Sequence, residues 1–128
     1  MTVIVDDIDV MCVVAQGGPS GGSAAFHALE SPLKGLKGRR FYGTYLAGEY
    51  RACVALQPDD DPATLGLSTW TIPGGKFERR KLMGWQNRLA EIKATFVAMA
   101  DQFEADESRP SVEFYRSAQE LIMFLPVK

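Results

Sequence analysis

The secondary structure elements that the sequence predicts follow the same order twice, and this repetition limits the folds that the chain can adopt. Each half runs strand, helix, strand, strand. When the sequence is slid along itself so that position 58 lies over position 126, the apolar run 53–58 covers the run 121–126, and Tyr45 lies over Glu113. The two halves share little sequence identity, so the order and spacing of the elements carry the argument. They predict an internal structural repeat.

The first half contains three predicted strands and one short helix. Residues 3–15 are rich in β-branched and apolar side chains and predict one strand. The helix that follows is expected to end near Pro32, because proline disrupts a helix interior. Two further strands are expected at 39–46 and 49–57, joined at Ala47-Gly48.

The second half repeats this pattern with a longer helix. A strand is expected at 76–83, and two closing strands flank the polar link 116–119. Between them, residues 87–104 predict an amphipathic helix that covers a sheet. Its apolar stripe consists of Leu89, Ile92, Phe96, Met99 and Phe103.

Two such modules side by side predict an α+β fold: an antiparallel sheet with two helices on one face, related by an approximate twofold axis. We expect a single domain over residues 1–128, with modules at about 1–58 and 66–128. A groove would lie between the helices, with the central strands as its floor. The symmetry places Tyr45 and Glu113 in the same part of this groove.

Composition and charge narrow the classes of partner. The net charge of −2 gives no support for a nucleic acid or an anionic membrane surface as a partner, since both favour a basic excess. No apolar run approaches the roughly 20 residues that a membrane-spanning helix needs. Cys12 and Cys53 lie in apolar runs and are interpreted as reduced core residues, with a bridge between neighbouring strands as the alternative. With no secretory signal in the sequence, the expected location is the cytoplasm.

Three short motifs resemble those of a known family. Thr71-Ile-Pro-Gly-Gly-Lys-Phe77, followed by Gly84, is similar to the central signature of the GyrI-like small-molecule-binding domain. Arg109-Pro-Ser-Val-Glu-Phe-Tyr115, with Leu125-Pro-Val127 at the end, resembles the closing strands of that family, and Phe41-Tyr-Gly-Thr-Tyr45 resembles its aromatic-glycine strand. The resemblance covers nearly the whole chain, in the order and spacing that the repeat also shows.

The resemblance implies a function as well as a fold. The family also supplies the effector-binding domain of multidrug-responsive bacterial transcription regulators, in which two modules enclose a pocket for lipophilic, often cationic compounds. An acidic residue of its C-terminal module faces the charge of the ligand, and the matching position here is Glu113. Some stand-alone members are hydrolases of electrophilic compounds that use this glutamate. The chain is shorter than usual around the first helix and has no room for a DNA-binding helix-turn-helix.

Glu113 is therefore the principal candidate site residue, although a solvent-facing strand position is the simpler interpretation of one glutamate. A carboxylate in an apolar cavity is costly to desolvate, so it either takes up a proton or binds a cation. Aromatic side chains are candidates for the walls of the pocket, with core packing as the alternative for each. They are Tyr42, Tyr45, Trp70, Trp85 and Tyr115.

Other sites have little support in the sequence. His27 is the only histidine, and no Cys/His cluster predicts a metal site. The glycine-rich segment 17–22 lacks the ending of a phosphate-binding loop, so no cofactor is expected.

Three functions stay open. The first is a stand-alone sensor or sequestering protein for hydrophobic, cationic small molecules. The second is a small hydrolase with Glu113 as acid or base and Tyr45 or Tyr115 assisting. The third is an interaction module with a protein partner, and homodimerisation is open as well. Non-enzymatic binding is favoured, because no second acid or histidine is clearly placed beside Glu113.

Overall fold

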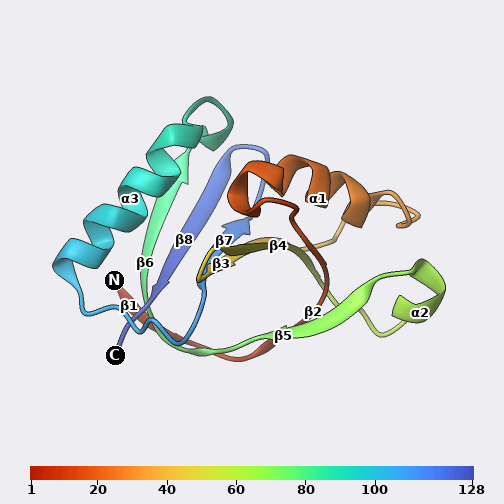
Figure 1. The fold of residues 1–128 in the computed structure, drawn as a ribbon, viewed down its shortest axis with the longest axis horizontal. Helices are drawn as coiled ribbons and strands as arrows, with labels where there is room; N and C mark the ends of the chain where they lie inside the picture. Colours follow the sequence, from red (N-terminus) through yellow and green to blue (C-terminus); the bar gives the residue numbers. More distant parts are fainter.

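All eight strands of the protein belong to one antiparallel sheet, which curls beneath two helices in the computed structural model of residues 1–128 (Figure 1). The strands are β1 (Thr2–Val5), β2 (Ile8–Val14), β3 (Phe41–Leu46), β4 (Glu49–Ala55), β5 (Ser68–Ile72), β6 (Gly75–Met83), β7 (Ser111–Tyr115) and β8 (Glu120–Pro126). The helices are α1 (Gly22–Glu30), α2 (Pro62–Leu65) and α3 (Leu89–Gln102), with 3₁₀ turns η1 (Gly18–Gly21) and η2 (Trp85–Asn87).

The order of the strands is symmetric about the centre of the sheet. The order β1-β6-β8-β7-β3-β4-β2-β5 places β7 and β3 in the middle, each followed outward by its hairpin partner and then by the first strand of its module. The edges are exchanged between the modules: β1 precedes β2 but pairs with β6, and β5 precedes β6 but pairs with β2. The predicted α+β fold, with an antiparallel sheet and helices on one face, is confirmed, and the strand order has the symmetry that the two predicted modules require.

The N-terminal segment differs from its prediction. Residues 3–15 were expected to form one strand, but β1 and β2 lie in opposite halves of the sheet. The chain turns at Asp6 and Asp7, which are poor strand formers. The Asp7 carboxylate accepts a hydrogen bond from the backbone N–H of Gly74 at 2.7 Å and so fixes this turn to the start of β6.

Helix α3 is shorter than its apolar stripe. Met99 is buried, and Ile92 and Phe96 pack on β8 and its neighbours. The ends of the stripe leave the sheet, since Leu89 is 61% exposed and Phe103 is 36% exposed. The first turn of α3 therefore extends beyond the sheet toward α1. None of the helices combines the length and the hydropathy that a membrane crossing requires.

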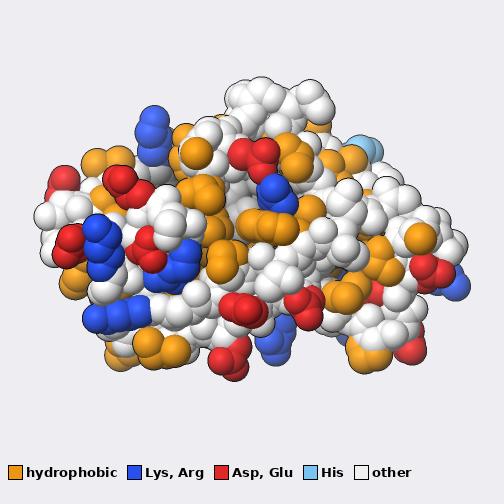
Figure 2. Space-filling model, turned by 60° about the horizontal axis from the view of Figure 1, so that its bottom comes forward, with side chains coloured by type: hydrophobic (Ala, Val, Ile, Leu, Met, Phe, Trp, Pro, Cys, Tyr) orange, Lys and Arg blue, Asp and Glu red, His pale blue; other side chains and the backbone are white.

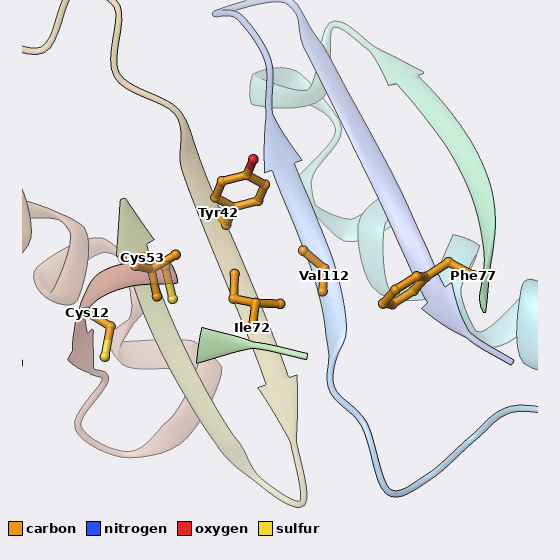
Figure 3. Packing of buried hydrophobic residues seen from close by; sticks show 7 residues of the cluster. Cys12, Tyr42, Cys53, Ile72, Phe77 and Val112 are labelled. Carbon is orange, nitrogen blue, oxygen red and sulfur yellow. The ribbon is translucent and has the colours of Figure 1, made fainter. Parts of the chain in front are cut away.

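Alternation along the strands gives the sheet two apolar faces. One face packs under α1 and α3. The other carries no helix and contains a cluster that includes Tyr42, Ile72, Phe77 and Val112 (Figure 3). Cys12 and Cys53 belong to the cluster on this face and lie directly opposite each other on β2 and β4. Both thiols are free. Burial raises the pKa of both thiols.

Gly75 makes room for the side chain of Arg109. The guanidinium of Arg109 donates hydrogen bonds to the carbonyl oxygens of Gly74, Lys76 and Val127, at 2.9–3.3 Å. It also pairs with the Asp106 carboxylate at 2.9 Å. Gly75 has φ +133°, and a Cβ added there would lie 2.8 Å from an Arg109 nitrogen. Through these hydrogen bonds Arg109 connects the start of β6 with the end of the chain.

Candidate functional site

A pocket of about 740 Å³ lies between α1, the central strands and the segment that begins α3. Four aromatic rings on β3, β4, β7 and η2 and a fifth on α1 contribute to its walls. No lysine or arginine lines it. The lining residues are Pro19, Ser20, Gly22, Ser23, Phe26, His27, Glu30, Phe41, Tyr50, Trp85, Leu89 and Tyr115.

Glu113 is held by two phenol hydroxyls that belong to this lining. Its Oε1 atom accepts hydrogen bonds from Tyr50 Oη at 2.7 Å and from Tyr115 Oη at 2.6 Å. The two hydroxyl oxygens lie 3.2 Å apart. Glu113 is half-buried and is not itself a lining residue. Its negative charge therefore lies behind the two tyrosines that line the pocket.

Gly43 makes this arrangement sterically feasible. It lies opposite Glu113 in the pairing of β3 with β7, and opposite Ala52 in the pairing with β4. A Cβ atom at this position would lie 2.1 Å from Tyr50 Oη and 2.6 Å from Glu113 Oε1. Only glycine leaves the space above the strand in which the phenol and the carboxylate meet.

The electrostatics of the cluster keep both phenols protonated. Burial raises the pKa of Tyr50 and of Tyr115 far above the usual tyrosine range, and the neighbouring Glu113 carboxylate raises both further. Both hydroxyls therefore stay available as donors at neutral pH. Their two hydrogen bonds fix the position of the Glu113 carboxylate.

Edge-to-face contacts hold the aromatic walls together. The rings of Phe26 and Tyr115 have centroids 5.4 Å apart at 83°, and those of Trp85 and Tyr115 are 5.0 Å apart at 63°. The indole N–H of Trp85 donates to the carbonyl oxygen of Ser117 at 3.1 Å, which fixes the ring. Such pairs prefer this geometry because ring edges are positive and ring faces negative. Tyr115 thus forms part of the pocket wall and also donates a hydrogen bond to the Glu113 carboxylate.

The structure brings together three of the residues predicted for the site. Tyr115 and Trp85 line the pocket, and Glu113 contacts Tyr115. Tyr45 lies on the same face of β3 as Gly43, but it pairs with Ser111 rather than Glu113, is 43% exposed and does not line the pocket.

Two other predicted residues lie elsewhere. Tyr42 projects to the opposite face of the sheet, where its ring stacks on Phe114 with centroids 4.9 Å apart. Trp70 lies on the edge strand β5, and the Arg51 guanidinium sits 4.1 Å from the centre of its ring.

Sequence reasoning missed Tyr50 and Gly43. Tyr50 begins a run that predicts a buried strand, so its side chain was interpreted as core packing and not as a hydrogen-bond donor. A signal was available, because a hairpin joined at Ala47-Gly48 places Tyr50 opposite Tyr45, on the face of β3 that Gly43 shares. His27 lies in the pocket lining on α1. No group of three or more His, Cys, Asp or Glu side chains is arranged to hold a metal ion.

Comparisons with known proteins match the fold. No protein-family profile and no curated protein sequence matches the chain. Among solved structures, an integron cassette protein from the mobile metagenome of Vibrio cholerae superposes with a TM-score of 0.70 at 14% identity, over 100% of this chain and 95% of the other.

Two further structures are of a ligand-bound protein and of a hydrolase. The structure of SAV2435 bound to tetraphenylphosphonium has a TM-score of 0.64 at 15% identity, over 100% and 93% of the two chains. A hydrolase from Listeria innocua has a TM-score of 0.61 at 14% identity, over 100% and 91%. At these identities the likenesses show a shared fold.

Proposed function

We propose that this protein binds hydrophobic organic cations in the pocket beneath α1, with Glu113 as the counter-charge. The observation that carries the proposal is the Glu113 carboxylate, held by Tyr50 and Tyr115 beside an aromatic pocket that no lysine or arginine lines. The fold and the sequence motifs together support membership of the GyrI-like family, as one domain that acts as a cytoplasmic sensor or sequestering protein.

The chemistry of the pocket favours a large, soft cation. A volume of about 740 Å³ lies within the range of small-molecule sites. Ring faces of Tyr50, Tyr115 and Trp85 attract a cation, by about 0.5–2 kcal/mol each where they are desolvated. Glu30 lines the pocket and Glu113 contacts two of its lining residues, and both carboxylates repel anions. A protein of similar fold holds tetraphenylphosphonium, a cation of this class.

The first experiment titrates the protein with tetraphenylphosphonium and follows tryptophan fluorescence. Trp85 lines the pocket and Trp70 does not, so the Trp85→Phe variant should lose the response and Trp70→Phe should keep it. A unit charge pair 6–12 Å apart at an effective dielectric constant near 20 interacts by roughly 1.4–2.8 kcal/mol. We therefore expect Glu113→Gln to weaken binding by about tenfold to a hundredfold.

Triphenylphosphine oxide, a neutral analogue, separates charge from shape. It should bind wild type and Glu113→Gln with similar affinity. Equal affinity of tetraphenylphosphonium for wild type and Glu113→Gln would refute charge recognition by this carboxylate. A response that persists in Trp85→Phe and vanishes in Trp70→Phe would place the ligand elsewhere.

A second candidate function is hydrolysis of electrophilic compounds. The observation that favours it is the contact of two protonated phenols with one carboxylate oxygen, at 2.6 and 2.7 Å. The carboxylate would accept a proton from attacking water, and Tyr50 or Tyr115 would donate to the leaving oxygen. In this case Glu113→Gln removes turnover of an epoxide or ester substrate while binding persists, whereas the binding function predicts no turnover in wild type.

A further inference from the structure

A second pocket, of about 190 Å³, lies on the face of the sheet that carries no helix. It is bounded by β3 and β7, by the turn between β1 and β2, and by the segment between β5 and β6. Figure 2 looks toward the underside of the view in Figure 1, where hydrophobic side chains gather near the middle of the molecule among acidic and basic ones. The lining residues are Val5, Asp6, Ile8, Tyr42, Ile72, Pro73, Phe77, Val112, Phe114 and Phe124.

Alternation along the two central strands separates this pocket from the first. On β7, Glu113 and Tyr115 project toward α1, while Val112 and Phe114 project to the other face. On β3, Phe41 lines the first pocket and Tyr42 the second. The two pockets therefore lie back to back, with the sheet between them.

The walls of the second pocket are aromatic and preformed. Tyr42 stacks on Phe114 with an interplanar angle of 20°, and Phe77 meets Phe124 edge to face at 5.9 Å. Figure 3 shows Tyr42 and Val112 on neighbouring strands, with Ile72 close by. These rings are held by their neighbours, so little ordering is needed when a flat molecule enters.

Asp6 is the one charged residue of the lining. It is exposed at the rim, and its carboxylate makes no hydrogen bond or ion pair within the protein. It therefore offers an acceptor to a ligand that carries an N–H or O–H group. No basic side chain lines the pocket, and its apolar interior disfavours a charged ligand.

We infer that this pocket binds a small, neutral aromatic molecule of one or two rings whose donor group reaches Asp6. Its volume is of the same order as the dry apolar cavity of about 150 Å³ that is known to accept benzene. It is too small for tetraphenylphosphonium. The two pockets thus select different ligands, the first a bulky cation and the second a compact neutral ring.

The test adds indole to the intact protein and follows the NMR resonances of its methyl groups. Ile8, Ile72 and Val112 report on the second pocket, and Leu89 reports on the first. We expect saturable shifts of the first three methyl groups with indole, and little change at Leu89. Absence of saturable shifts, or shifts confined to Leu89, overturns the assignment.

Two variants sharpen the test. Ile8 is half-buried at the rim, so Ile8→Trp fills the pocket from outside and should weaken indole binding at least tenfold. The Asp6→Ala variant changes an exposed residue and should fold normally. Wild type should prefer indole to 1-methylindole, which lacks the donor, by roughly threefold to tenfold, and Asp6→Ala should abolish this preference. Unchanged affinity in Ile8→Trp, or a preference that survives in Asp6→Ala, contradicts the inference.

Discussion

Substitution of Gly43 by alanine should damage the cluster around Glu113 more than its size suggests. The added methyl group would stand 2.1 Å from Tyr50 Oη and 2.6 Å from Glu113 Oε1, and atoms at such distances must move. Tyr50 has little freedom to move, because its ring is buried against α1 and contacts Phe26. The hydroxyl is therefore expected to lose its contact with the carboxylate.

The magnitude follows from two costs. Overpacking of a well-filled site costs about 1–3 kcal/mol. Loss of a hydrogen bond to a charged group costs about 1.5–3 kcal/mol, and the lower part of this range applies because water can reach the half-buried Glu113. We expect the free energy of unfolding to fall by about 2–4 kcal/mol, with tetraphenylphosphonium binding weakened as well.

Urea unfolding measures this change, and Gly35→Ala is the matched control. Gly35 has no atom within 4 Å of an added Cβ and no positive φ, so alanine there should change stability by less than about 0.5 kcal/mol. The double variant Gly43→Ala/Tyr50→Phe removes the closest clashing atom, so its cost should be smaller than the sum of the single costs. A Gly43→Ala variant as stable as Gly35→Ala, or strictly additive costs, would refute the reasoning.

Three further predictions concern other contacts. Arg109→Lys cannot reproduce the fork that reaches three carbonyl oxygens, and urea unfolding should show a loss of about 3 kcal/mol; a loss below about 1 kcal/mol contradicts the role of this fork. Hydrogen bonds from Ser108 and Arg109 lower the pKa of Asp106 to about 2, so its contribution to stability is present above the ordinary Asp pKa and is lost as the pH falls from about 4 toward 2. Asp106→Asn should flatten stability profiles in this window, and an unchanged slope speaks against it. The raised pKa values of Tyr50 and Tyr115 imply the opposite dependence, with stability lost as the pH rises above about 10. Absorbance titration should show that both phenols ionise only when the protein unfolds at alkaline pH. In Tyr50→Phe, one fewer tyrosine should ionise in this step.

The order of the elements was predictable because it depends on local patterns. The hairpin of β3 and β4 was predicted to within two residues at each end, and the Ala47-Gly48 connection is correct. The break between β1 and β2 was not predicted, because each segment alone has the composition of a strand. What separates them is pairing with partners in opposite halves of the sheet, which no local pattern encodes.

The candidate site shows where symmetry reasoning stops. An offset between the halves predicts that the first strands of the two hairpins occupy equivalent places, and β3 and β7 pair at the centre of the sheet. It does not fix their register, and a shift of two residues keeps every side chain on its face while changing its partner. Tyr45 is therefore paired with Ser111, and Glu113 is paired with Gly43. Over Gly43, which has no side chain, Glu113 accepts its hydrogen bond from Tyr50 on β4. The partner of the carboxylate could be identified only from the hydrogen-bonded pairing of three strands.

This exchange of partners bears on the choice between binding and hydrolysis. A general base must release and take up a proton readily, whereas Glu113 Oε1 is engaged by two phenols whose own protons are tightly held. The two donated hydrogen bonds fix the orientation of the carboxylate and occupy both lone pairs of this oxygen, which therefore cannot also accept a proton from attacking water. Such a group is better suited to attract a cation than to activate a nucleophile. The same phenols that orient Glu113 are therefore an argument for binding as the principal function.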